Sequence, residues 1–333
     1  MKIIPSLFLA ASLSVGFITI NGCSKSSNPA EIVEPAPDPD PEPPMIEVPL
    51  TDYDLTSLSS TDLFLSTPQE VLLEDQTDNE LSGIAASHKN PNIHYMHNDS
   101  DNSPIIVTNE KAEKLAKIYL DGMHISDPED ISVGPGPDKD KTYIYYGTIG
   151  DNNKTKSNIT VFRFEEPDLT GVEKGTEVHI AKVDQIKLSY PGTPFNAEAL
   201  LIDPLTKDIY IATKEVNRST IYKAAYPQST TEVTILEPTV QMRFFDLFTS
   251  GDISADGKEI LLRNRSQIWY WVRNKGASIQ ETLLTAPKIA PYAGNEHQGE
   301  GIGFTADGKG YVTNTESRDY PGAISQLSFY KRK

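Results

Sequence analysis

Short hydrophobic runs separated by polar turns recur along residues 51–333, and five of them begin alike. Each opens with an acidic or small residue, then a second small or acidic residue, then an aliphatic one. The five opening phrases are Ser82-Gly83-Ile84, Glu129-Asp130-Ile131, Glu198-Ala199-Leu200, Gly251-Asp252-Ile253 and Glu300-Gly301-Ile302. Apolar runs of this length with turn residues at their ends are typical of buried β-strands. The pattern therefore predicts one equivalent strand at each phrase.

A turn and a second hydrophobic run follow each of these strands. The turns contain Asp-Gly, Pro-Gly, Asn-Pro or Asp-Pro pairs, which favour tight reversals of the chain. The returning strands are predicted at 93–98, 142–147, 208–213, 259–263 and 310–313. The repeating element is thus an antiparallel hairpin.

The spacing of the phrases predicts the fold. Their middle residues are separated by 47, 69, 53 and 49 residues. Repeats of roughly 40 to 50 residues with about four strands each are typical of β-propeller blades. The long second interval contains a predicted strand at 159–164 and a strand pair within 178–190, which fit one blade with enlarged loops. We predict an all-β fold, a single β-propeller with five blades; six blades and an irregular β-sandwich are the alternatives.

The two ends of this domain are predicted to share one blade. The last phrase is followed by a turn, a returning strand and an apolar run at 324–330, whereas residues 71–73 form an isolated apolar run before the first phrase. Pairing of these two runs would cover the open edge between the first and last blades. We therefore expect a ring closed by mixed N- and C-terminal strands.

Residues 1–22 have the pattern of a signal peptide. Lys2 precedes an apolar stretch that extends to Ile20, as in secretory signals, although a single membrane-spanning anchor is the alternative. Cys23 is the only cysteine of the chain, so an internal disulfide is excluded.

The segment Ile20-Asn21-Gly22-Cys23 resembles the lipobox of bacterial lipoproteins. The resemblance implies a lipid on the Cys23 thiol and anchoring in a lipid bilayer, for which several acyl chains are needed. By the sorting rule of Gram-negative lipoproteins, Ser24 implies a place in the cell envelope at the outer membrane.

Residues 23–50 are rich in proline and acidic residues, so we expect an extended tether rather than a folded segment. Partner recognition by this polyproline stretch is the alternative. The whole chain carries a formal charge of −17, and most of it lies on residues 51–333. Such a surface repels polyanions, so we expect no nucleic acid polymer among the partners.

The predicted topology brings carboxylates together. The first strand of a blade is innermost and the second runs antiparallel to it, so the start of one and the end of the other lie on the same face. Acidic side chains that crowd one axis repel each other unless a cation lies among them. Oxygen ligands without histidine or thiol favour calcium. The candidate calcium ligands are Ser82, Glu129, Glu198, Asp252 and Glu300. A water-filled mouth in which each glutamate bonds to neighbouring backbone amides is the alternative.

The ends of the second strands add a mixed set of charges around this ring. Candidate water-positioning, catalytic residues are Asp99, Asp151 and Glu316. Candidate ligand-binding residues are Asn152, Lys214, Arg263 and Arg265. Carboxylates and cations on one face could position water and hold phosphate oxygens.

Three stretches resemble two known families. Gly147-Thr148-Ile149-Gly150-Asp151-Asn152 and Arg163-Phe164-Glu165-Glu166-Pro167 resemble bacterial β-propeller lipoproteins of a phytase-like or esterase-like group. Glu80-Leu81-Ser82-Gly83 is more distantly similar to the five-bladed calcium-activated nucleotidases, or apyrases. That likeness implies an axial calcium held by Ser82, Glu129, Glu198 and Glu300. Gly251 departs from the pattern, because a serine is expected there.

These features predict a membrane-anchored extracytoplasmic lipoprotein with an axial calcium site that acts as a binding or recognition module. Its partner at the propeller face would be a small molecule, a glycan or a protein. No nucleophile motif of the hydrolases occurs in the sequence. A calcium-dependent phosphoester or nucleotide hydrolase is the alternative.

Overall fold

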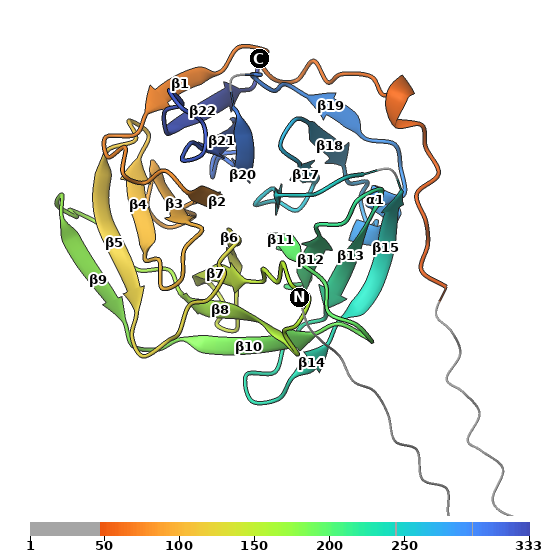
Figure 1. Cartoon of the computed structure of the whole chain (residues 1–333), viewed down its shortest axis with the longest axis horizontal. Coiled ribbons are helices and arrows are strands. Elements are labelled where there is room, and N and C mark those ends of the chain that lie inside the picture. The colour runs from red at the N-terminus through yellow and green to blue at the C-terminus, as the bar shows by residue number, and fades with distance from the viewer. Residues whose placement is uncertain (1–46, 244, 295) are drawn as a thin grey trace, which may run out of the picture. The chain divides into compact units, whose positions relative to one another are not determined.

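Five β-sheets stand around a common axis (Figure 1). The structure, a computed structural model, describes residues 47–243, 245–294 and 296–333. The innermost strand of each sheet is the one predicted at a phrase: β2 (Leu81–Ala86), β6 (Asp130–Pro135), β11 (Ala197–Ile202), β16 (Ser250–Ile253) and β20 (Gln298–Phe304). Each inner strand contacts the next, and β20 contacts β2. The prediction of a five-bladed β-propeller is confirmed, and the six-bladed alternative is wrong.

The remaining strands of each blade follow outward from the axis, each antiparallel to the one before it. The second strands are β3 (Ile93–Asn98), β7 (Thr142–Thr148), β12 (Ile209–Thr213), β17 (Glu259–Arg263) and β21 (Gly310–Glu316). The third strands are β4 (Ile105–Asn109), β8 (Ile159–Glu165), β13 (Arg218–Ala224), β18 (Ile268–Val272) and β22 (Gln326–Lys331). The fourth strands are β5 (Lys114–Leu120), β10 (Asp184–Ser189), β15 (Glu237–Arg243), β19 (Lys288–Ala290) and β1 (Gln69–Leu72).

The ring closes as predicted, through strands from both ends of the domain. β1 pairs antiparallel with β22, so that Val71 lies opposite Leu327. The last blade therefore takes its outermost strand from the start of the domain, and cannot form until both ends have come together.

The long second interval differs from the prediction in one respect. β9 (Thr176–Ile180) does not belong to its own blade but pairs parallel with β5 of the blade before it. Likewise β14 (Thr234–Ile235) pairs parallel with β10. β9 and β14 each add a fifth strand to the preceding blade. Their pairing satisfies backbone groups that the fourth strand would otherwise leave unpaired.

The outer edges of the third and fourth blades pair with the N-terminal part of the domain, residues 47–66, which we call the strap. Leu50 forms an isolated bridge with β15, the outer strand of the third blade, and Ser60 forms one with β19, the outer strand of the fourth. Phe64 forms a third bridge with Arg332, which follows β22. A short 3-10 helix, η1 (Leu55–Ser57), lies between the first two bridges and is capped by Asp54. The outer strands of the first four blades thus pair with segments from elsewhere in the chain, and the outer strand of the fifth blade, β1, itself comes from the start of the domain.

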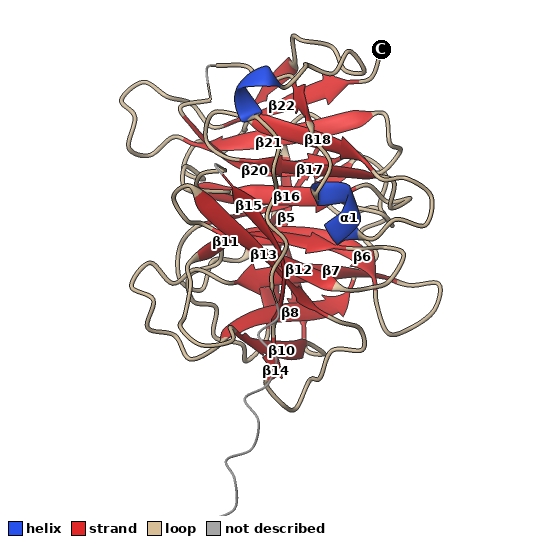
Figure 2. Ribbon diagram, turned by 90° about the vertical axis from the view of Figure 1, so that its right-hand side faces the viewer, coloured by secondary structure: helices blue, strands red, loops and turns tan. Residues whose placement is uncertain are grey.

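Large apolar and aromatic side chains fill the layers between blades, and Trp271, Tyr145 and Phe245 are among the most deeply buried. Helix α1 (Ile279–Leu283) lies on the rim and begins with a capping box between Ser278 and Glu281. The side view shows strands through the body of the ring and loops on both faces (Figure 2). No helix of the described residues is long and apolar enough to cross a membrane.

The small residues of the phrases have a packing reason. A methyl group on Gly83 would lie 2.6 Å from the backbone nitrogen of Ile131 in the next inner strand. On Gly301 it would lie 2.5 Å from the Ser82 carbonyl oxygen. Only glycine allows inner strands to approach this closely near the axis.

Predictions for the signal peptide, for Cys23 and for most of the tether lie outside the described residues. The last predicted tether residue, Leu50, already bonds to the propeller by pairing with Gln241.

Candidate functional site

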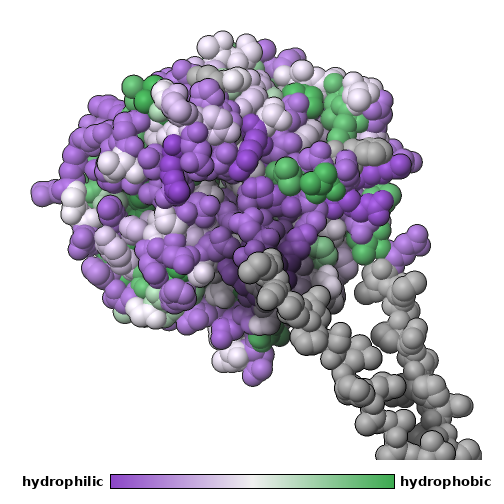
Figure 3. Space-filling model, viewed as in Figure 1, coloured by the Kyte–Doolittle hydropathy of each residue, from purple (hydrophilic) through white to green (hydrophobic). Residues whose placement is uncertain are grey.

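A polar cavity of about 140 Å³ lies where the inner strands begin. Its described lining residues are Leu81, Ser82, Asp99, Glu129, Asn152, Glu198, Lys214, Arg265, Glu300 and Glu316. All of these except Leu81 are among the residues predicted from the sequence to form the site. In the face-on view of the ring, hydrophilic residues gather around the centre and hydrophobic ones are scattered (Figure 3).

The hairpin topology explains why these residues meet. Glu129 precedes β6 directly, and Ser82, Glu198 and Glu300 lie near the starts of their inner strands. Lys214 follows β12 on the same face, since second strands end where first strands begin. Spacing along the sequence thus translates into one cluster at the axis.

Two of the axial carboxylates are paired with cations. Lys214 Nζ donates to Glu198, and both side chains are largely buried. Arg265 Nε lies 3.3 Å from Glu300 Oε1. An axial cation was predicted because the axial carboxylates repel one another, and these two ion pairs offset part of that repulsion. The remaining negative charge is therefore unevenly distributed around the axis.

The uncompensated charge lies on one side of the cavity. Asp99, Asp127 and Glu129 each offer an oxygen, and these atoms lie within 4.8 Å of one another. Glu129 is 3% exposed, and its carboxylate accepts no hydrogen bond from the described residues. Lys156 Nζ lies 3.3 Å from Asp127. Three carboxylates with one cation at their edge form an arrangement that a hard cation would stabilise.

The electrostatics of these groups agree with this geometry. Burial, and then the charges of Glu198, Asp99 and Asp127, raise the pKa of Glu129 well above its usual range. Partial burial and the neighbouring Asp127 raise the pKa of Asp99 to about 6. Burial and the charge of Glu198 raise the pKa of Glu300 to about 8. Each raised pKa means that the ionised carboxylate is destabilised in its place.

Asp127 was missed by the sequence reasoning. It lies in the loop before the second phrase, and its backbone has a φ of 58°, in the left-handed region. Among the other phrases only the first also has a carboxylate two residues before it, Glu80, so the repeat gave no consistent signal. The run Asp127-Pro128-Glu129-Asp130, with three acids in four residues, could have indicated it.

Ser82 lines the cavity, but its hydroxyl donates a 2.5 Å hydrogen bond to the carbonyl oxygen of Glu129. The hydroxyl therefore links the first two inner strands while its lone pairs remain available to the cavity. Asn152 is exposed at the mouth and accepts a hydrogen bond from Asn196.

Asp252, a predicted calcium ligand, lies outside the cavity. Its carboxylate accepts hydrogen bonds from the amides of Ile253 and Phe304, at 2.9 and 2.8 Å. Gly251 has no side chain, and a methyl group there would meet Leu262 and Leu201 rather than the cavity, so neither residue lines it. The fourth blade therefore contributes no side chain from its phrase, and the prediction for Asp252 is corrected.

Two further predicted residues have structural partners instead. The Asp151 carboxylate accepts hydrogen bonds from the amides of Thr155 and Lys156 and thereby caps its own loop. Arg263 is fully buried and lies 2.8 Å from Glu296. Neither lines the cavity. Both strand ends were assigned correctly, but the direction of a side chain at a strand end depends on packing that no repeat specifies.

Comparisons with known proteins show no family for this chain. No protein-family model matches the chain, and no curated protein matches it either. Among solved structures, U3-55K is 8% identical with a TM-score of 0.38 over 74% of this chain and 79% of its own. The RRP9 WD40 repeats are 7% identical with a TM-score of 0.38, over 75% of this chain and 79% of their own. A Bacteroides uniformis protein assigned as a 6-phosphogluconolactonase is 11% identical with a TM-score of 0.34, over 75% of this chain and 71% of its own. Values this low give no information about function.

Proposed function

We propose that this chain is a lipid-anchored β-propeller of the cell envelope that binds calcium in its axial cavity and acts as a recognition module. The observation that carries the metal proposal is the buried Glu129 carboxylate, which faces Asp99 and Asp127 and accepts no hydrogen bond from the described residues. A buried charge without a partner costs several kilocalories. A cation would remove that cost.

The chemistry of the donors favours calcium over other cations. The candidate ligands are carboxylate oxygens, and calcium accepts six to eight oxygens in flexible arrangements that include water. Magnesium requires a tight octahedron, which a cluster open to the cavity on one side does not provide. His97 lies nearby in the fold but is fully buried against Tyr146, so it is not a ligand.

The ligand of the recognition module would lie against the same face. Lys214 and Arg265 are at the cavity, but each is already paired with a carboxylate. The cavity is also below the 300 Å³ or more that is typical of small-molecule pockets. These features support a surface contact with a partner, organised by the metal, rather than an enclosed substrate.

The alternative is a calcium-dependent phosphoester or nucleotide hydrolase. Asp99 favours it, since a pKa of about 6 suits a general base near neutral pH. Release of phosphate from ATP and from p-nitrophenyl phosphate, measured in calcium, tests it. Turnover by the wild type that is lost in Asp99→Asn would replace the recognition proposal with this one.

Thermal unfolding of the full-length protein in detergent, in EDTA, calcium or magnesium, tests the metal site. Calcium at about 100 times its Kd should stabilise the fold by roughly 2.7 kcal/mol, which is about 5 °C or more for a domain of this size. In EDTA the Glu129→Gln variant should be more stable than the wild type, because one repelling charge is gone. In calcium the variant should be the less stable of the two proteins. Asp256→Asn, in an exposed turn, is the matched control. Equal melting temperatures in EDTA and millimolar calcium would exclude the site.

The lipid anchor is tested separately. Cys23→Ser should abolish incorporation of labelled palmitate in cells and leave the precursor unprocessed, while the calcium response of the purified protein stays unchanged. A variant that is still labelled would show that the lipid is attached elsewhere.

A further inference from the structure

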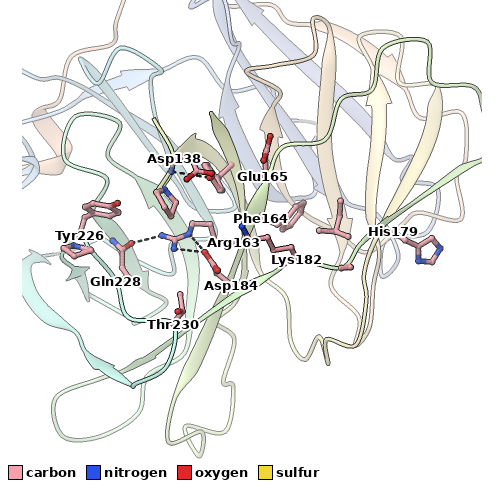
Figure 4. A pocket seen from close by; sticks show the side chains of 15 residues that line it. Asp138, Arg163, Phe164, Glu165, His179, Lys182, Asp184, Tyr226, Gln228 and Thr230 are labelled. Carbon is pink, nitrogen blue, oxygen red and sulfur yellow. Dashed lines mark hydrogen bonds and ion pairs between the residues drawn. The ribbon is translucent and has the colours of Figure 1, made fainter. Parts of the chain in front are cut away.

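A second and larger groove lies at the opposite ends of the strands from the axial cavity. Its volume is about 560 Å³, within the range of ligand-binding clefts. It extends along the ends of β8 and β10, between the residues that follow β9 and the loop after β13 (Figure 4). No residue of the axial cavity lines it.

The floor of the groove is a fixed polar network. Arg163 is 3% exposed, and its Nε and one terminal nitrogen donate to the same Asp184 oxygen, at 3.0 and 2.8 Å. Its other terminal nitrogen donates to the buried Gln228 at 3.2 Å, and Gln228 in turn donates to the carbonyl oxygen of Lys207. The network holds each side chain in one orientation and leaves the second oxygen of Asp184 able to accept a hydrogen bond.

One wall of the groove is aromatic. Tyr226 is partly exposed and stands at one end of the groove (Figure 4). Its ring lies 5.0 Å from Lys207 Nζ. Phe164 and Tyr143 add buried ring surface to the lining. Within the described residues, no hydrogen bond engages the Tyr226 hydroxyl or the hydroxyl of Thr230 in the same loop.

The charges of the groove are nearly all paired. Arg163 is neutralised by Asp184, and Lys141 lies 3.2 Å from Asp138 and 2.8 Å from Glu165. A charged ligand would therefore find little counter-charge. A ligand with many hydroxyl groups fits better, since each hydroxyl can donate to a carboxylate and accept from an amide or ammonium group.

We propose that this groove binds a neutral sugar unit of a glycan, with an apolar sugar face against Tyr226 and its hydroxyls on Asp184, Thr230 and Lys182. The fixed Arg163 network lowers the entropy lost on binding, because its side chains are already ordered. This site is separate from the axial cavity, so binding does not require calcium.

The test uses the full-length protein in lauryldimethylamine oxide, a detergent without sugar groups. A printed array of neutral and acidic glycans identifies the strongest neutral binder, and calorimetric titration with that glycan gives its Kd. Tyr226→Ala should weaken binding about tenfold and Thr230→Val about threefold, and the melting temperature should change little. Tyr320→Ala, at an exposed aromatic on a different part of the ring, should bind like the wild type.

Three outcomes would overturn the proposal. They are no neutral glycan above background, unchanged Kd in both groove variants, or selective binding of acidic glycans that disappears at high salt. Repeating the titration in EDTA separates this proposal from the metal proposal: the Kd should be unchanged, even if the axial cavity proves to hold no calcium.

Discussion

Gly150 lies directly against the carboxylate of Glu129: a methyl group at position 150 would come within 2.3 Å of Glu129 Oε1 and 2.6 Å of Asp127 Oδ2. The two carboxylates can stand this close together only because the residue beside them has no side chain. Gly150, the glycine of the Gly-Asp-Asn sequence, therefore shapes the candidate metal site by leaving room for these two carboxylates.

Gly150→Ala should consequently abolish most of the calcium-induced rise in melting temperature. Because the added methyl must displace one of the carboxylates, we also expect a loss of roughly 1 to 3 kcal/mol in EDTA. Gly294→Ala is the control, since a methyl group there meets nothing within 4 Å. A calcium response as large in Gly150→Ala as in Gly294→Ala would mean that the metal, if bound, lies elsewhere.

The Lys214–Glu198 pair makes a different prediction. Lys214→Met leaves Glu198 buried and unpaired, and breaking a fully buried pair costs about 3 to 5 kcal/mol. Lys214 is slightly exposed, so we expect on the order of 2 kcal/mol. Lys214→Met combined with Glu198→Gln should recover much of this loss, because the unpaired charge is removed. Chemical denaturation of the two single variants and the double variant measures the coupling, and simple additivity would show that the two residues do not act as a pair.

Much of this architecture was predictable because the inner strands are nearly equivalent. Close packing around the axis requires glycine at Gly83 and Gly301, and each inner strand begins a hairpin of the same kind, so similar phrases recur along the sequence. The closing pair of β1 and β22 was predictable for a related reason, since an unpaired edge on either side of a ring is unfavourable.

The parts that escaped prediction depend on contacts that occur only once. Asp127 enters the site from a loop with no counterpart in the other blades. Arg263 turns inward to Glu296 rather than to the axis, and β9 pairs with the preceding blade. Each outcome was decided by packing between distant segments, and the periodic pattern carries no information about such packing.

The strap should contribute to the stability of the whole ring. Phe64 is 1% exposed and packs edge-to-face on Tyr270 and Tyr311, with ring centres 5.6 and 4.9 Å away. Phe64→Ala should cost about 3 to 5 kcal/mol, as for other buried phenylalanines. Leu63→Ala, at a neighbouring residue that is 39% exposed, should change the free energy of unfolding by less than about 0.5 kcal/mol. Similar losses in both variants would mean that the strap is held by its backbone alone.

The pH dependence of stability should depend on His94. This residue of β3 is 3% exposed, its ring packs on Phe329 at 5.4 Å, and its Nδ1 has no hydrogen-bond partner among the described residues. Burial lowers the pKa of His94 from 6.5 to about 4. Below pH 6.5 the unfolded chain binds a proton that the folded chain does not, so stability is complete above that pH and falls as the pH approaches 4.

His94→Phe keeps the ring contact and removes this proton. As the pH falls from 6.5 to about 4, the free energy of unfolding of the wild type should fall relative to that of the variant. The expected fall is about 1.4 kcal/mol per pH unit, or roughly 3 kcal/mol in all. Above pH 7.5 the two curves should run parallel, which provides an internal control. Burial also lowers the pKa of His97 to about 4, so the variant should retain some acid sensitivity rather than lose it all. Denaturant titrations at intervals between pH 4 and 8 measure both curves, and a constant difference across that range would show that His94 does not couple protonation to unfolding.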